Sequence, residues 1–442
     1  MKASKYNHVF AMNDGTYLYN SLWRGLHKVE DSVVSAVSAI ERGNPELVNA
    51  LPDAYRETLK EHHYVLDDTF DEEAVIRSQR EALQHDKRAL SLTIAPTLDC
   101  NFGCPYCFEG SNKPRPRMTN AVIDAIIAFA DRMCTNETKV LSVTWFGGEP
   151  LLALPQIERL TALLRAFVGR RQMAYKASII TNGYGLTHKT AAKLKALGVE
   201  WAQVTLDGTA EYHNRRRFLK ASHGPTFQRI VDNIAEACDD LRISVRVNID
   251  HSNRDGYLPL AEMLREDPRI GTKVKPYPAF TDDLGDYSWE CSFADLDSFV
   301  TAQADIYSGA PELGDVIFPY PRATRVFCGA QSDMTWVIAP NGDLHKCWDT
   351  IADETQAVGS VISGVDDTRA SYWLNWGAEL EKCQSCRLAP LCMGGCAYKA
   401  LVRNGEPQCQ VSLDLVKYSV GVLAKTHATT HPSVPEPEIE RR

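Results

Sequence analysis

The sequence predicts an α/β protein built on a partial (β/α)6 TIM-like barrel, with a cysteine-rich C-terminal region and a small N-terminal α+β unit. From about residue 91, apolar β-rich runs alternate with amphipathic helical runs, which indicates parallel βα units. From about residue 320, turn signals replace the long periodic runs and seven cysteines gather. We therefore expect metal, rather than a large apolar core, to hold that region together.

The barrel accounts for the middle of the chain. Because active sites of such barrels form on the loops that follow the strands, we expect the site on that face. The expected strands are 91–97, 140–146, 175–181, 201–206, 242–249 and 273–280, and the expected helices between them are 119–134, 155–169, 187–197, 225–239 and 255–266.

The N-terminal unit precedes the barrel. Residues 16–29 have strand-and-turn character, and 31–43 and 44–59 have helical patterns. Residues 71–90 are expected to form a linking helix, because acidic residues open the segment and basic residues close it. The C-terminal region contains a predicted hairpin that turns at Asn341-Gly342.

Four regions follow from these patterns. We expect an N-terminal unit that caps the barrel or recognises a peptide at 1–90, the barrel at 91–310, the cysteine-rich region at 311–425 and a disordered tail at 426–442. The tail is rich in proline and charge, which is typical of segments that do not fold.

Composition limits the function. The 442 residues suffice for two or three domains, and the net charge of −9 argues against a nucleic-acid partner. The N-terminus has no apolar signal region and no run is long enough to span a bilayer, so we expect a cytoplasmic protein without a membrane partner. In that compartment the thirteen cysteines are interpreted as metal ligands rather than disulfides.

Three cysteines lie on the loop after the first barrel strand. Cys100, Cys104 and Cys107 are close in sequence, and Gly103 and Pro105 permit a tight loop around them. A zinc site would need a fourth protein ligand nearby, and the loop offers none. The pattern favours an iron–sulfur cluster over zinc.

This loop, followed by TWFGGEP at 144–150, resembles the radical S-adenosylmethionine (radical SAM) superfamily. The resemblance implies that the three cysteines are catalytic and bind a [4Fe–4S] cluster, whose fourth iron is chelated by the methionyl amino and carboxylate groups of S-adenosylmethionine. It also implies that an aromatic residue packs near the adenine and that the GGEP stretch contacts the methionyl amine. Those cofactor-binding residues are Tyr106, Gly147, Gly148, Glu149 and Pro150.

Two further segments match the family in order. ITNG at 180–183 and TLDG at 205–208 end the third and fourth strands. The resemblance suggests Asn182, Thr205 and Arg217 as contacts to the ribose or carboxylate of S-adenosylmethionine. The basic run 215–220 has a plain alternative, a solvated face.

The seven C-terminal cysteines form an ordered set. A Cys-x2-Cys pair alone could be a zinc knuckle, but the whole set resembles the SPASM domain of radical SAM enzymes. By that resemblance the chain holds two auxiliary [4Fe–4S] clusters, three clusters in all. Auxiliary cluster I takes Cys328, Cys347 and Cys396, and auxiliary cluster II takes Cys383, Cys386, Cys392 and Cys409.

Auxiliary cluster I is one ligand short. Cys291 could supply the fourth ligand, or the site is open to substrate or to a non-cysteine ligand. Cys291 could equally be an ordinary semi-buried thiol, and Cys134 and Cys238 are interpreted as small core residues on helices.

The resemblance implies a peptide maturase. Such an enzyme uses a 5′-deoxyadenosyl radical to abstract hydrogen from a ribosomally made precursor peptide and forms an intramolecular thioether, C–C or C–O crosslink. We expect the leader of that peptide to add a strand to the N-terminal sheet, and a flavodoxin or ferredoxin to supply electrons. The catalytic base cannot be named from the sequence.

Three alternatives stay open. The nearest is an anaerobic sulfatase-maturating enzyme, which makes formylglycine. Such enzymes tend to begin close to the first cysteine motif and to ligate auxiliary cluster I fully with cysteine, and this chain has neither feature. An iron–sulfur electron carrier and a zinc-binding interaction protein are more distant, and the GGEP and barrel patterns argue against both.

Overall fold

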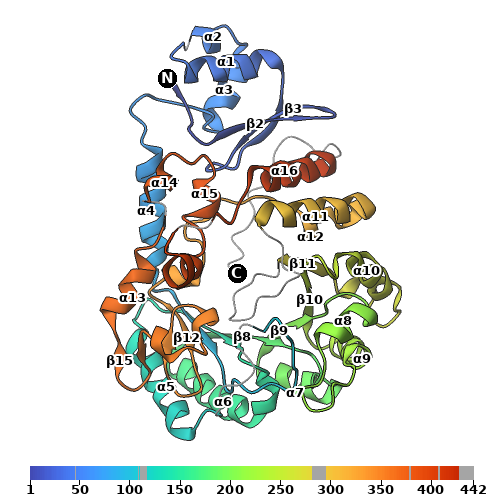
Figure 1. The fold of residues 1–442 in the computed structure, drawn as a ribbon. Coiled ribbons are helices and arrows are strands. Elements are labelled where there is room, and N and C mark those ends of the chain that lie inside the picture. The colour runs from blue at the N-terminus through green and yellow to red at the C-terminus, as the bar shows by residue number, and fades with distance from the viewer. Residues whose placement is uncertain are drawn as a thin grey trace.

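The computed structural model describes the chain except for residues 45, 108, 110–116, 281–294, 378–379, 407–408 and 428–442. Cys291 and most of the expected tail lie outside the described residues. Figure 1 shows the N-terminal unit at one end of the molecule, the barrel at the other, and much of the C-terminal region between them. No helix of the described part is both long and apolar enough to cross a membrane.

Six parallel strands form the barrel and follow one another in sequence order, which confirms the predicted fold class. Within each of the first two strands, apolar side chains alternate with half-buried polar ones. One face of the sheet therefore packs on helices while the other presents polar groups to the barrel interior. The strands are β6 (Ala89–Ile94), β7 (Val140–Trp145), β8 (Ala174–Thr181), β9 (Val199–Thr205), β10 (Arg242–Ile249) and β11 (Pro276–Phe280).

Helices cover the outer face of this sheet (Figure 1). Five of them lie within a few residues of their expected ranges, because each has a strong apolar face. A sixth, α8, was not predicted, since its sequence is short and polar. The helices are α5 (Asn120–Met133), α6 (Leu154–Arg171), α7 (His188–Ala196), α8 (Ala210–Arg216), α9 (Phe227–Ala237) and α10 (Tyr257–Glu266).

A hairpin from the cysteine-rich region extends the barrel sheet. Strand β12 (Thr335–Ile338) pairs in parallel with β6, and β13 (Leu344–His345) pairs antiparallel with β12. The expected turn is present, and Gly342 has φ of +93° there. The sequence predicted the hairpin but not its addition to the barrel, which brings the cysteine-rich region to the first barrel strand.

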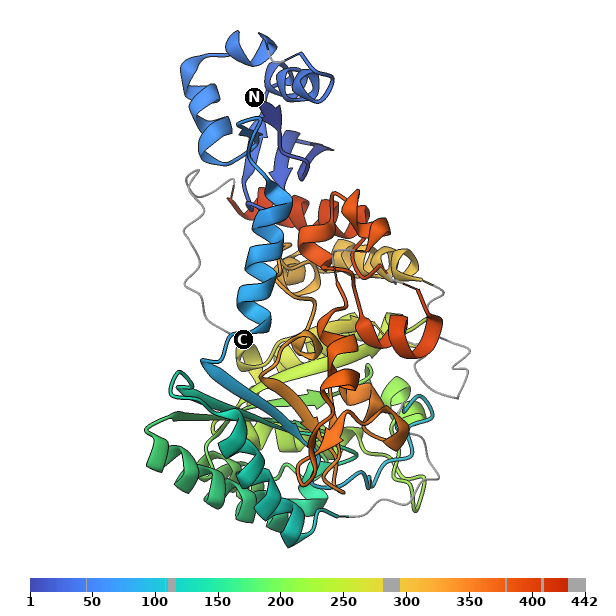
Figure 2. The ribbon, with the colours of Figure 1, turned by 90° about the vertical axis from the view of Figure 1, so that its left-hand side faces the viewer.

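The N-terminal unit contains a three-stranded antiparallel sheet with β3 in the centre. Helix α4 (Glu72–Gln84) leads from this unit to the barrel (Figure 2), and Arg80 on it donates hydrogen bonds to the Leu374 and Trp376 carbonyls. The strands are β2 (Asn7–Met12), β3 (Gly15–Asn20) and β4 (Leu26–Val29), a separate pair is β1 (Lys2–Ala3) with β5 (Val65–Leu66), and the helices are α1 (Asp31–Glu41), α2 (Glu46–Asn49) and α3 (Asp53–Glu61).

The remaining C-terminal elements are mostly short. The longest, α16, was not predicted, and its Val416 and Val420 pack against Phe10 and Tyr19 of the N-terminal sheet. The elements are α11 (Leu296–Gly309), α12 (Gly314–Ile317), β14 (Gly359–Ser360), β15 (Gly364–Val365), α13 (Asp367–Leu374), α14 (Glu381–Gln384), α15 (Ala389–Cys392) and α16 (Leu413–His427). Two short helical turns used below are η5 (Gly329–Gln331) and η6 (Trp348–Thr350).

Candidate active site

A cavity of about 300 Å³ lies where the barrel strands β6 to β10 end. It brings together most of the site residues predicted within the barrel, although they are spread over more than a hundred positions, and none of the seven C-terminal cysteines lines it. Its lining includes Cys100, Cys104, Tyr106, Cys107, Gly147, Gly148, Asn182, Thr205 and Arg217. Glu149 and Pro150 are buried beside the cavity but are not among its lining residues.

The cysteine loop is fastened to the segment after α8. The Gly103 N–H donates to the Phe218 carbonyl at 3.0 Å, and the Lys220 N–H donates to the Asn101 carbonyl at 2.8 Å. A Cβ at Gly103 would come within 2.9 Å of the Phe218 ring, so the close approach requires glycine. The loop is thus positioned by contacts far away in sequence.

Gly147 and Gly148 pack against the backbone that leads into the cysteines. Gly147 has φ of +115°, and a Cβ there would lie 2.2 Å from the Thr97 carbonyl oxygen. At Gly148 a Cβ would lie 2.4 Å from the carbonyl oxygens of both Leu98 and Asp99. Real Cβ atoms do not come so close, so both glycines are required for the loops after β6 and β7 to meet.

Glu149 ties the end of β7 to the end of β8. Its carboxylate accepts hydrogen bonds from the Thr181 hydroxyl (2.7 Å), the Asn182 N–H (2.7 Å) and the Leu151 N–H (3.0 Å). Burial raises the pKa of Glu149, and these three hydrogen bonds oppose that shift. The geometry supports a positioning role for this carboxylate, whereas the sequence suggested a direct contact to the cofactor.

Asn182 stands between Glu149 and the cysteine loop. Its side-chain Nδ2 donates to Asn101 Oδ1 at 2.7 Å and lies 3.9 Å from the Cys100 sulfur. Since its backbone is held by Glu149, the side chain is fixed from both directions. It can therefore orient a ligand or a thiolate at this edge of the cavity.

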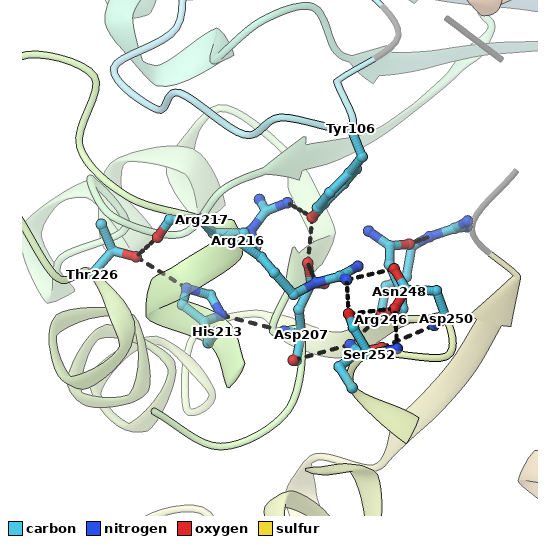
Figure 3. Close-up of polar contacts among 11 residues, drawn as sticks. Tyr106, Asp207, His213, Arg216, Arg217, Thr226, Arg246, Asn248, Asp250 and Ser252 are labelled. Carbon is cyan, nitrogen blue, oxygen red and sulfur yellow. Dashed lines mark hydrogen bonds and ion pairs between the residues drawn. The ribbon is translucent and has the colours of Figure 1, made fainter. Parts of the chain in front are cut away.

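Tyr106 and Arg217 both line the cavity and contact each other (Figure 3). The Tyr106 hydroxyl donates to Asp207 and accepts a hydrogen bond of 2.8 Å from Arg217 Nη1. Arg217 Nε is buried without a hydrogen-bond partner. A buried guanidinium with an unused donor suits an anionic group in the cavity.

Arg216 is not among the cavity-lining residues and pairs with two carboxylates (Figure 3). Its guanidinium lies 3.3 Å from Asp207 and 2.5 Å from Asp250, and both carboxylates are fully buried. Arg215 next to it is exposed and pairs only with Glu211. The interpretation of the basic run as a solvated face therefore holds for Arg215 but not for Arg216 or Arg217.

His213 and Asn214 support the residues around Tyr106 and Arg217 through hydrogen bonds. His213 Nδ1 accepts a hydrogen bond from the Asp207 N–H at 3.2 Å, and its Nε2 lies 3.0 Å from the Thr226 hydroxyl. Asn214 Oδ1 accepts from the N–H groups of Thr226 and Phe227 at the start of α9. The two residues therefore support Asp207 and α9 rather than a ligand.

Polar side chains on β9 and β10 complete the interior wall. Gln203, Arg246 and Asn248 line the cavity with Thr205, and Arg246 Nε donates to Asn248 Oδ1 at 2.8 Å. The sequence analysis missed these three. Their alternation with buried apolar residues along the strands was the available signal.

The cysteine-rich region also contributes to the cavity. Trp348 and Asp349 line it, and the Trp348 ring stacks on Phe146 with 5.6 Å between ring centres. Neither residue was predicted. The signal that could have found them is their position directly after Cys347.

The C-terminal cysteines influence one another electrostatically. Burial raises the pKa of Cys347, and Cys328 and Cys396 are close enough to raise it further. The pKa of Cys383 is likewise raised by burial and then by Cys392, Cys386 and Cys409. The allocation of these cysteines to two clusters stays a prediction.

The cysteine thiols that bind an iron–sulfur cluster need not be close enough together to bind a single metal ion. In the described part of the chain, no three His, Cys, Asp or Glu side chains are close enough together to bind a single metal ion. Each cysteine of a [4Fe–4S] cluster binds a different iron, so wider spacing suits a cluster. Loop cysteines at the cavity wall, together with the Arg217 guanidinium, fit an anionic cluster and a ligand that carries a carboxylate.

Comparison with known proteins agrees with this site. Residues 94–263 match the family model described as the radical SAM superfamily. The mycofactocin maturase MftC of Mycolicibacterium smegmatis is 27% identical over 351 residues, which are 72% of this chain and 82% of that protein. The radical SAM cyclopropyl synthase TigE of Paramaledivibacter caminithermalis is 23% identical over 44% of this chain, and that match spans about half (47%) of TigE.

Solved structures share the fold. Native anSMEcpe, with bound AdoMet and the Cp18Cys peptide, superposes with a TM-score of 0.57 at 16% identity, over 77% of this chain and 96% of that one. SuiB of Streptococcus suis, bound to S-adenosylmethionine, superposes with a TM-score of 0.55 at 13% identity, over 94% of this chain and 100% of that one.

Proposed function

Because residues 94–263 of this chain belong to the radical SAM superfamily, we propose that this radical SAM enzyme is a peptide maturase that forms an intramolecular crosslink in a ribosomally made precursor peptide. The observation that carries the proposal is the shared cavity. Its walls include the cysteine loop of the barrel and the Trp348-Asp349 turn that follows a cysteine of the C-terminal set. A substrate in this cavity would lie between the first cluster and an auxiliary cluster.

The cluster and S-adenosylmethionine, when bound, supply a 5′-deoxyadenosyl radical that abstracts hydrogen from the substrate. Cys100, Cys104 and Cys107 hold the cluster as thiolates. Gly147 and Gly148 would allow the backbone to pass close to the cluster, and the Asn182 side chain would orient the ligand beside the cluster. Tyr106, Thr205 and Arg217 enclose the opposite side, where the guanidinium offers its free donor to a carboxylate.

The barrel interior positions the peptide. Gln203, Arg246 and Asn248 present amide and guanidinium groups that can hydrogen-bond a peptide backbone, while Trp348 offers an exposed ring to an apolar side chain. Holding one carbon beside the radical, and keeping water away from it, is the main contribution such a cavity makes to rate and selectivity.

The N-terminal sheet offers an edge for the leader peptide. The outer side of β2 is covered near its start, where Arg387 Nη1 donates to the Asn7 carbonyl and His8 Nε2 lies 3.2 Å from the Arg387 carbonyl. The other edge strand, β4, pairs only with β3 in the described part of the chain. A leader that adds a strand would use β4.

Two comparisons support a peptide substrate. A solved structure of SuiB is titled as bound to its precursor peptide, SuiA, and it covers 94% of this chain. That share is too large to leave out the first 90 residues of the 442, whereas the share covered by anSMEcpe is 77%. The N-terminal unit therefore favours a precursor peptide over a sulfatase.

The cofactor complement is part of the proposal. We assign three [4Fe–4S] clusters to the chain, with the two auxiliary clusters accepting the electron that crosslinking releases. The regions 1–90, 91–310 and 311–425 would recognise the leader, generate the radical and hold the auxiliary clusters. A flavodoxin or ferredoxin would reduce the first cluster.

Mass spectrometry tests the function. Reconstituted protein would be incubated anaerobically with S-adenosylmethionine, a reductant and the short peptide encoded beside it. We expect the peptide to lose two hydrogens with an equal amount of 5′-deoxyadenosine, and fragmentation to locate one new bond between two residues.

The alternative is formylglycine formation, which the fold shared with anSMEcpe keeps open. It would change a single Cys or Ser, and hydrazine-type reagents would then label the product aldehyde. An unchanged peptide together with 5′-deoxyadenosine would contradict the crosslinking proposal for that peptide while leaving the radical chemistry intact.

A further inference from the structure

Auxiliary cluster I, as assigned above, has three cysteine ligands and lacks a fourth. We propose that the Asp349 carboxylate is that fourth ligand. The inference rests on the proposed cluster set and goes beyond it, because it fixes a ligand type that the cysteine pattern leaves open.

The first support is contact. The Cys347 thiol donates to Asp349 Oδ2 at 3.6 Å, so the carboxylate already lies beside one of the three sulfurs. This contact places the Asp349 carboxylate at the sulfur of one of the three assigned ligands.

The second support is the rigidity of the turn. Cys347 caps η6, and the Thr350 hydroxyl donates back to the Cys347 carbonyl at 2.8 Å. Trp348 is held by its stacking on Phe146, so Asp349 is fixed between Cys347 and the barrel. Carboxylate oxygen is an accepted ligand for iron, and a preplaced side chain binds at little cost in entropy.

The third support is that neither of the two other cysteines in the described part of the chain belongs to this group. Cys134 ends α5, and Cys238 ends α9, where its thiol hydrogen-bonds the Ala235 and Arg269 carbonyls. Both belong to the helical layer of the barrel. Cys291 lies outside the described residues, so it remains a rival that the experiment must address.

The position of Asp349 determines which iron of auxiliary cluster I would face the substrate. Asp349 lines the cavity in which the substrate is proposed to bind. The iron that it ligates would therefore face that cavity, and a carboxylate is a weaker ligand for iron than a thiolate. This iron would be the most exchangeable of the cluster.

The experiment uses the full chain with Cys100, Cys104 and Cys107 replaced by Ala, so that only auxiliary clusters contribute to the spectra. Three variants are made in this background. Two are Asp349→Ala and Asp349→Cys, and the third is a control, Asp367→Ala, at an exposed acidic position on α13. Each protein is reconstituted with 57Fe, its iron is counted, and Mössbauer and EPR spectra are recorded with and without added imidazole.

We expect the parent and the Asp367→Ala control to keep their spectra when imidazole is added. Asp349→Ala should bind imidazole at one iron and should lose about one iron per protein after mild oxidation, leaving a three-iron signal. Asp349→Cys should retain its iron through the same oxidation. Restored retention by a thiolate would separate ligation from a general loss of folding.

Two results would overturn the inference. If the parent binds imidazole as readily as Asp349→Ala, the site is open. If Asp349→Ala matches the control while Cys291→Ala loses the iron, the ligand is Cys291. A background protein without iron would instead contradict the auxiliary clusters themselves, which distinguishes failure of the proposed function from failure of the ligand assignment.

Discussion

At the scale of single residues, the buried charged groups beside the cavity have two kinds of role. Some are placed to contact a ligand, and others hold the contacting residues in position. Glu149 is the clearest case. Its carboxylate is 2% exposed and accepts three hydrogen bonds from the ends of β7 and β8. It thus fixes Asn182, which reaches the cavity in its place.

We expect Glu149→Gln to weaken binding of S-adenosylmethionine about tenfold and to lower the free energy of unfolding by about 1–3 kcal/mol, because one amide donor would face the N–H and O–H donors that the carboxylate now satisfies. Calorimetric titration and urea unfolding measure the two effects. Glu158→Gln, which only breaks an exposed pair with Lys193, should change stability by less than about 1 kcal/mol. Equal effects of the two variants would contradict the positioning role.

Arg216 and its neighbour Arg215 provide a second contrast. Arg216→Met would leave the buried carboxylates Asp207 and Asp250 without their cation, and we expect it to cost about 3–5 kcal/mol. Arg215→Met removes only an exposed pair with Glu211 and should cost less than about 0.5 kcal/mol. Thermal unfolding of both variants checks this, and equally mild effects of Arg216→Met and Arg215→Met would contradict the structural role of the buried ion pairs.

At the scale of elements, the N-terminal sheet is fastened to its helices by buried polar contacts. On β4, His27 Nδ1 lies 2.9 Å from the Tyr64 hydroxyl, and its ring is 4.4 Å from that of His62 at the end of α3. Burial, together with the smaller effect of the nearby His62, lowers the pKa of His27 to about 4. The imidazole is therefore neutral when folded at neutral pH.

This histidine makes the unit sensitive to acid. Between the ordinary pKa of about 6.5 and the folded value of about 4, the unfolded chain binds more protons than the folded chain. Stability should consequently fall as the pH decreases through that window and level off below it. Thermal unfolding of the full chain at pH 7 and pH 4.5 should show a smaller loss for His27→Gln than for the parent, and equal losses would contradict the assignment.

At the scale of the whole molecule, the cavity is shared between regions that are distant in sequence. Trp348 comes from the cysteine-rich region, stacks on Phe146 of the barrel and keeps 46% of its surface exposed. It can therefore hold a substrate side chain against the barrel opening.

We expect Trp348→Ala to reduce crosslinked product about tenfold while 5′-deoxyadenosine formation falls much less, because the radical would form beside a poorly held peptide. Tyr372→Ala, at a position that is 62% exposed and outside the cavity lining, should leave both products unchanged. Chromatography of the nucleoside and mass spectrometry of the peptide give the ratio. A parallel loss of both products would place the effect of Trp348 on S-adenosylmethionine instead.

Much of the fold follows from local patterns in the sequence. Alternation of apolar residues predicted the six barrel strands to within a few residues, and helical periodicity predicted five covering helices, because burial of one face dictates both patterns. Helix α8 was not predicted, because its seven residues, AEYHNRR, have almost no apolar face. Its place is decided by the buried contacts of His213 and Arg216.

Some features of the candidate site likewise follow from the sequence, and others depend on the tertiary structure. The sequence by itself determined the cysteine spacing and the two glycines after β7, because a cluster or a close backbone approach needs those residue types at those intervals. The tertiary structure alone decided that Glu149 faces inward, that Arg216 and Arg217 are buried while Arg215 is not, and that Trp348 and Asp349 reach the cavity. The reason is physical, because Glu149 and Arg216 are placed by contacts between neighbouring barrel elements, and Trp348 and Asp349 follow the parallel pairing of β12 with β6. These contacts join segments distant in sequence and leave no local pattern in it.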